Sequence, residues 1–297
     1  MSSLLNRVKS KMYIASYRKA THALEGEYVS LMRGRSMDFD DLREYAVGDD
    51  IKDIDWKASA RHSSPLVKRY IASRKQPVIF VVDAGKNMNA ITESGETKKD
   101  IAIDIMGILG YLTVRHSDTV GLLIGDAENT LRIPNRESET HLERLLEKAN
   151  SQITPESKDG DILKQLEFLS TSVKTRGLIV VIADEVELTT EFDAILRKLN
   201  AKHELLWISV TDGNPLTQVE IGDGIVRDIE TNELIPDYIR QNKKLRKLFE
   251  ESETARKETT DHYLRKIGIS HASVSNSVSL IPSLLKLLER RVRERRR

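Results

Sequence analysis

Two aspartates, Asp83 and Asp184, each directly follow a short apolar run that is rich in β-branched residues. Such runs are typical of strands buried on both faces of a sheet. Because ligands of open α/β sheets bind at the carboxyl ends of parallel strands, we expect both carboxylates on one rim. This rim is therefore where function should be sought. One interpretation is that both carboxylates accept hydrogen bonds from backbone groups or basic side chains, with Lys86 as a cation that could neutralise them.

The elements that must position these side chains are short strands alternating with helices. This alternation predicts an α/β fold with a mostly parallel sheet and helices on both faces. Residues 3–20 form a basic amphipathic pattern, which predicts a helix packed on the body or a contact with a membrane surface or partner. Ser279 is a plausible N-cap of the last helix. Strands are expected at 66–71, 78–82, 120–124, 130–133, 177–184, 203–210 and 271–275, and helices at 98–115, 137–149, 160–173, 190–200, 238–266 and beyond 279.

A second group of carboxylates lies in the segment 34–61, where four aspartates fall within seven residues: Asp49, Asp50, Asp53 and Asp55. If residues 51–56 are extended, Ile51, Asp53 and Asp55 share one face of the strand. One hypothesis is a segment docked by Phe39, Ile54 and Trp56 and fixed by internal ion pairs. A second is a docking surface for the basic groove of a partner. A third, a two-metal hydrolase site, needs carboxylates that converge from several strands.

The composition of the chain and the absence of several motifs exclude some classes of function. A formal net charge of +1 excludes a globally basic duplex-binding protein, and 5% aromatic residues argue against a single-strand stacking surface. The absence of cysteine excludes disulfides and thiolate chemistry. There is no phosphate-binding loop, dinucleotide fingerprint or zinc motif. Among the scattered histidines, His62 is notable for its position beside the acidic segment.

The pattern D-A-G-K-N at 83–87 resembles the D-x-S-x-S metal loop of von Willebrand factor A and integrin I domains. That resemblance implies a divalent ion held by an aspartate, two serines, a threonine and a later aspartate, which here would be Asp184. Gly85 and Asn87 replace the two serines, and the position nearest the threonine is Gly160. The resemblance therefore implies a degenerate, weakly held magnesium site at Asp83, Asn87 and Asp184, with the side-chain carbonyl of Asn87 as a remaining oxygen ligand.

The segment 34–61 resembles the signature of a bacterial domain-of-unknown-function family, number fifty-eight in its series. Lys52 and Asp53 stand where that family more often has arginines, and the stretch 225–234 resembles its hairpin. The resemblance spans roughly residues 20–290 and implies a von Willebrand factor A-like fold. It also implies association with MoxR-type AAA+ ATPases. The matching residues are Gly34, Arg35, Phe39, Leu42, Arg43, Glu44, Tyr45, Gly48, Asp49, Asp50, Ile54, Asp55, Trp56, Ala60 and Arg61.

Together these features predict a cytoplasmic, non-enzymatic protein-binding module that acts as partner or adaptor of a MoxR-type ATPase on an unknown client. The alternatives are a divalent-metal-dependent ligand-binding domain of the integrin I type and a metal-dependent hydrolase. No cofactor is expected, with Mg²⁺ as the alternative, and neither a membrane span nor nucleic acid binding is expected. We divide the chain into an N-terminal helix with the acidic segment (1–76) and a von Willebrand factor A-like domain (77–297) with a hairpin at about 219–236. The partner-binding residues are predicted to be Arg43, Glu44, Asp49, Asp50, Asp53, Asp55, Trp56 and Arg61.

Overall fold

The computed structural model describes residues 3–14, 17–33, 39–62, 64–70, 75–92, 94–184, 186, 189–211 and 242–296. Within these residues, no helix combines the length and the apolar character that a membrane crossing requires. The hairpin predicted at about 219–236 lies outside the described residues.

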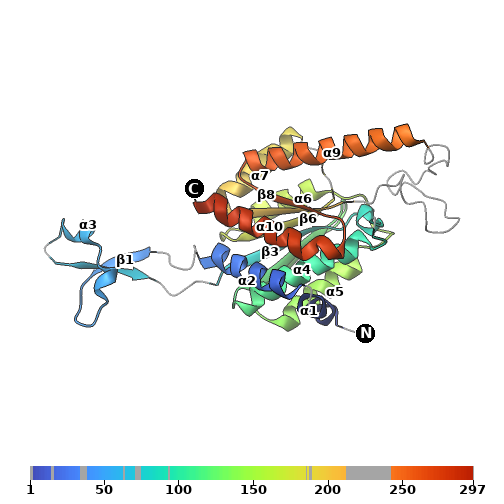
Figure 1. Cartoon of the computed structure of the whole chain (residues 1–297). Coiled ribbons are helices and arrows are strands. Elements are labelled where there is room, and N and C mark those ends of the chain that lie inside the picture. Colours follow the sequence, from blue (N-terminus) through green and yellow to red (C-terminus); the bar gives the residue numbers. More distant parts are fainter. Residues whose placement is uncertain are drawn as a thin grey trace.

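A six-stranded sheet forms the centre of the molecule, with strand order β5-β4-β3-β6-β7-β8 (Figure 1). Neighbouring strands are parallel, except that β5 runs antiparallel to β4 at one edge. The α/β class and the mostly parallel sheet are therefore confirmed. The strands are β3 (Pro77–Asp83), β4 (Thr119–Gly125), β5 (Thr130–Arg136), β6 (Leu178–Ala183), β7 (Glu204–Val210) and β8 (Ser270–Val274).

Helices pack on both faces of this sheet and enclose two apolar cores. Alternation along β3 places Val78, Phe80 and Val82 in one core, and Ile79 and Val81 in the other. Such two-sided burial explains why the strands read as continuous apolar runs. The first core is covered by α1 (Leu4–Tyr13), α2 (Arg18–Arg33), α4 (Lys98–Arg115), α5 (Glu139–Gln152) and α10 (Ser277–Arg296), and the second by α6 (Ile162–Ser172), α7 (Thr190–Lys202) and α9 (Lys243–Lys266).

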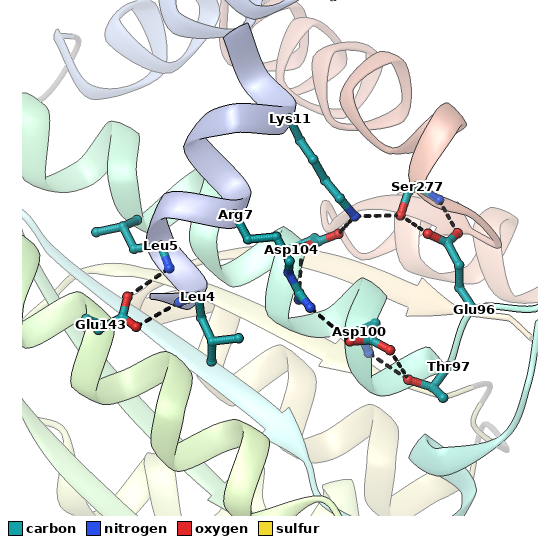
Figure 2. A network of polar contacts seen from close by, with 10 residues as sticks. All are labelled: Leu4, Leu5, Arg7, Lys11, Glu96, Thr97, Asp100, Asp104, Glu143 and Ser277. Atoms are coloured by element: carbon teal, nitrogen blue, oxygen red, sulfur yellow. Dashed lines mark hydrogen bonds and ion pairs between the residues drawn. The ribbon is translucent and has the colours of Figure 1, made fainter. Parts of the chain in front are cut away.

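The N-terminal helix α1 is tied to the sheet domain by charged groups (Figure 2). Glu143 on α5 accepts the backbone N–H groups of Leu4 and Leu5 at 2.8 Å, so a carboxylate caps the positive end of the helix. Further along, Lys11 pairs at 2.5 Å with Asp104 on α4, whose side chain is almost fully buried. A basic helix packed on the body is confirmed by these contacts.

The N-terminal pattern differs from expectation in two respects. The predicted helix at 3–20 is two helices, and α2 extends to Arg33 because Leu24, Tyr28 and Leu31 continue the buried face. Both helices share the core of the sheet domain. The expected boundary at residue 76 therefore separates elements that pack together.

Residues 39–62 and 64–70, here called the signature unit, form a small separate structure between α2 and β3. An antiparallel pair, β1 (Phe39–Glu44) and β2 (Leu66–Tyr70), encloses the short helices η1 (Ile51–Asp53) and α3 (Trp56–Ser59). Figure 1 shows this unit at the left, apart from the layered body. Residues 51–56 do not form one extended run, because Asp50 and Asp55 cap helical turns there.

The final helix begins slightly earlier than expected. Asn276 accepts the N–H of Ser279 at 2.7 Å through its side-chain oxygen, and α10 starts at Ser277. Asn276 therefore fills the capping role predicted for Ser279. At the other end of the helix, Arg291 pairs at 2.9 Å with the buried carboxylate of Glu204. Arg291 belongs to the stretch 290–297, which contains six arginines, so part of this stretch anchors α10 to the sheet.

A buried polar array joins β7, β8 and α9. The Ser209 hydroxyl lies 3.1 Å from Nε2 of His271, and Nδ1 of that ring lies 3.3 Å from Asp261. The order of groups is that of a hydrolase triad, but Ser209 is 3% exposed and its hydroxyl accepts the indole N–H of Trp207. Because no substrate could reach this hydroxyl, the array joins secondary-structure elements and does not present a nucleophile.

This array makes folding sensitive to acid. Burial lowers the pKa of His271 from its ordinary value of 6.5, assisted by Arg290 and Arg265 and opposed by Asp261. The unfolded chain therefore takes up a proton more readily, and the stability that neutral His271 provides is lost as pH falls below about 6.5. In urea unfolding, we expect the stability difference between wild type and His271→Gln to shrink from pH 7.5 to pH 5.5. A difference that stays constant over this range would contradict the assignment.

Candidate functional site

The carboxyl edge of the sheet brings together the two aspartates that the sequence predicts as partners. Strands β3 and β6 are parallel neighbours with Val82 opposite Ile182. Asp83 ends β3, and Asp184 directly follows β6. The two side chains therefore leave adjacent strands at one rim, although 101 positions separate them in the chain.

Asp83 is buried at this rim and is held by backbone. Its Oδ1 accepts the N–H of Gly85 at 2.9 Å. Burial raises the pKa of Asp83 to about 6, the Gly85 hydrogen bond and the Lys98 ammonium lower it, and the Asp184 and Asp161 carboxylates raise it. The pairing of β3 with β6 and the effect of Asp184 on the pKa of Asp83 both indicate that the two carboxylates are neighbours.

The cation at this rim is Lys98, the first residue of α4. Its Nζ lies 2.7 Å from Oδ1 of Asp184, and its side chain has 0% exposure. Lys86, the cation that the sequence suggested, pairs with Asp159 at 2.9 Å. Sequence reasoning missed Lys98, since a lysine in the first turn of a helix ordinarily points to solvent.

Two glycines close the space around Asp83. A Cβ at Gly85 would collide with the backbone of Gly160, and a Cβ at Gly160 would collide with the carboxylate of Asp83. The positions at which the metal loop of the resemblance has hydroxyl ligands are therefore filled by backbone contacts. Asn87 lies in the short helix η2 (Lys86–Asn89), which starts the loop after β3.

This donor set does not fit a divalent ion. Among the described residues, no three histidine, cysteine, aspartate or glutamate side chains are grouped to hold a metal. The two carboxylates that do meet share one ammonium, Lys98. The site predicted at Asp83, Asn87 and Asp184 thus lacks hydroxyl ligands at Gly85 and Gly160 and already has a cation beside Asp184.

In the signature unit, the predicted partner-binding carboxylates mostly hold the unit itself together. Asp49 pairs with Arg43 at 2.5 Å and accepts the N–H of Ala46, and these two contacts lower the pKa of its carboxyl. Asp50 caps η1 through the N–H of Lys52.

The remaining polar residues of the unit follow the same pattern. Asp55 caps α3 by accepting the N–H groups of Lys57 and Ala58, and Glu44 accepts the Ser64 hydroxyl at 2.7 Å. Internal polar contacts are thus confirmed as the means by which this short segment is fixed.

The apolar residues of the unit behave differently from expectation. Trp56 is 65% exposed and therefore does not dock the segment, whereas Ile54 is half-buried and pairs with Val67. Asp53 is half-buried, and Arg61 and His62 are exposed. Phe39 lies in β1.

The two candidate surfaces lie at opposite ends of the sheet. The signature unit ends at Tyr70, seven positions before the first residue of β3, Pro77, whereas the rim begins at the last residue of β3, Asp83 (Figure 1). A seven-residue strand spans about 20 Å. The structure therefore does not bring the signature unit and the rim loops into one recognition surface.

The packing at the rim predicts the effect of introducing, at positions 85 and 160, the hydroxyl residues that the metal loop of the resemblance has there. Gly85→Ser and Gly160→Thr are expected to lower the free energy of unfolding by about 1–3 kcal/mol, because the added atoms overpack a closed site. Gly26→Ala on α2 serves as the control, since nothing lies within 4 Å of the added carbon and helix propensity favours alanine. Urea unfolding measures all three; a Gly160→Thr variant as stable as wild type would contradict the packing.

Comparisons with known proteins identify the family of this chain. Uncharacterized proteins of Mycobacterium tuberculosis (strain H37Rv) and Mycobacterium bovis are 27% identical over 215 residues, 72% of this chain and 67% of theirs. A solved von Willebrand factor type A structure from Catenulispora acidiphila is 8% identical with a TM-score of 0.41, over 74% of this chain; this chain covers 43% of that one. The family model described as "Protein of unknown function DUF58" matches residues 41–259. Because this match spans well over half of the 297 residues, the chain belongs to the DUF58 family.

Proposed function

We propose that this chain is a non-enzymatic protein-binding module that recognises its partner through the signature unit. The observation that carries the proposal is a set of large apolar side chains exposed on a unit that folds by its own hydrogen bonds. Trp56 and Ile51 expose 65% and 64% of their surfaces, Val47 is fully exposed, and Tyr45 is partly exposed. Exposed aromatic and aliphatic side chains of this kind are typical anchors of protein interfaces.

The charges around these side chains indicate the chemistry of the partner. Residues 49–55 carry four aspartates and one lysine, a net charge of −3. Such a charge steers a basic surface towards the apolar anchors and disfavours acidic partners. We therefore expect the partner to present an apolar pocket with a basic border.

For the identity of the partner, we propose an AAA+ ATPase of the MoxR type, for which this chain would act as adaptor in chaperone-like assembly. The resemblance of the signature to that of ATPase-associated proteins supports this choice. In this arrangement the ATPase supplies the energy of ATP hydrolysis, and the signature unit supplies the contact. The client protein would bind elsewhere on the chain.

The hydrolase alternative receives no support from the positions of the acidic residues. Asp49, Asp50 and Asp55 accept backbone N–H groups within the unit. A two-metal site needs carboxylates that converge on paired ions, whereas these three are directed at separate turns. The integrin-type alternative loses its oxygen ligands at Gly85 and Gly160.

Binding by the wild-type chain to the MoxR-type ATPase encoded nearest to its gene tests the proposal. We expect Trp56→Ala to raise the dissociation constant by about 30-fold, because an aromatic anchor contributes about 2 kcal/mol. The matched control is Phe168→Ala, which removes an aromatic residue that is 41% exposed on α6 of the body. Isothermal titration calorimetry measures both variants.

Trp56 is the residue of choice because its side chain has little part in the fold. Charge reversal at Asp49 would break its pair with Arg43 and so confuse loss of folding with loss of binding. Wild-type protein that does not bind the ATPase, or equal weakening by Trp56→Ala and Phe168→Ala, would contradict the proposal.

A further inference from the structure

Lys98 occupies a position that is unfavourable for a cation. The N-terminus of an α-helix carries a partial positive charge, which favours acidic residues in the first turn. Lys98 is nevertheless the first residue of α4, and its side chain is completely buried. A buried ammonium is tolerated only when it is paired and hydrogen-bonded. Its pairing with Asp184 at 2.7 Å is therefore a requirement of the fold and not an incidental surface contact.

The backbone on both sides of Lys98 is fixed. Glu96 accepts the N–H of Ser277 at 2.8 Å, which attaches the loop to the start of α10 (Figure 2). Thr97 caps α4 by accepting the N–H of Asp100. The N–H of Lys98 itself donates to the carbonyl of Ala90 at 2.9 Å. These contacts hold the lysine stem in place and direct its ammonium inward.

The ammonium lies where a divalent ion would be expected on chemical grounds. Two carboxylates at the ends of adjacent parallel strands are hard oxygen ligands at a ligand-binding edge. The field of Lys98 acts on Asp83 as well as on Asp184. On the other side of Asp83, the backbone of Gly160 leaves no space for a further ligand.

We propose that the Lys98 ammonium is the built-in cation of this rim, taking the place of a divalent metal between Asp83 and Asp184. A covalently attached cation cannot be removed by chelation and does not respond to ion concentration. The rim of this chain is thus permanently closed, in contrast to a site that opens or closes with metal. This inference is independent of the function proposed for the signature unit.

Thermal unfolding of the full-length chain in EDTA and in 10 mM Mn²⁺ tests the proposal. We expect the wild-type midpoint to be the same in both solutions. Lys98→Ala should unfold at a lower temperature in EDTA, because two carboxylates are left without a cation. It should regain about 5 °C in Mn²⁺, because the space left by the lysine side chain admits a partly hydrated ion. This value assumes a dissociation constant near 0.1 mM, so that the Mn²⁺ concentration is about 100 times higher.

The matched control is Lys98→Met, which keeps the length of the side chain and removes only the charge. Its unfolding temperature should fall in EDTA without recovery in Mn²⁺, because the thioether fills the space that an ion would need. A double variant, Lys98→Met with Asp184→Asn, should be more stable than Lys98→Met alone, since it removes one uncompensated carboxylate.

Three results would overturn the proposal. One is a rise of the wild-type midpoint in Mn²⁺ that Asp83→Asn abolishes, which would show a metal beside the ammonium. Another is a Lys98→Ala variant that is as stable as wild type in EDTA. The third is equal recovery of Lys98→Ala and Lys98→Met in Mn²⁺. If Lys98→Ala does not fold at all, the wild type and the double variant still decide the question by the same comparisons.

Discussion

The neutralisation of a buried ammonium is the constraint on which the carboxyl edge of the sheet depends. The side chain of Lys98 has no exposed surface. The carboxylates that act on it, Asp83 and Asp184, lie at the ends of two strands that are far apart in the sequence. Only the parallel pairing of β3 with β6 places Asp83 and Asp184 where they can share this charge. A one-residue slip of β6 against β3 would turn the side chains of β6 to the other face of the sheet and displace Asp184 from this position. The charge thus helps to specify the order and register of the central strands.

The two ends of the sheet differ in how their charged and apolar side chains are arranged. At the carboxyl end, charges are buried, paired and enclosed by the glycines at 85 and 160. At the amino end, the signature unit leaves Trp56 and Ile51 exposed while its aspartates hold its short helices. The closed rim is suited to stability, and the open unit is suited to contact with another protein.

The sheet was predictable because parallel strands buried on both faces consist of continuous apolar residues, such as the run that ends at Asp83. The meeting of Asp83 with Asp184 followed from the same topology. Lys98 was not predictable, since the direction of its side chain depends on Glu96 bound to α10, a contact across 181 positions. The exposure of Trp56 was also missed, because a tryptophan beside apolar residues normally indicates burial. Capping by Asp50 and Asp55 had a local signal, since aspartates commonly begin helical turns.

The central claim is that the partner contacts the signature unit and not the rim of the sheet. Amide hydrogen exchange of the full-length chain, measured with and without the MoxR-type ATPase, tests this claim most directly. The account predicts slower exchange on adding the ATPase at residues 45–57 and unchanged exchange in the loops at 84–90 and 158–160. Protection of those loops, with no change at 45–57, would contradict it.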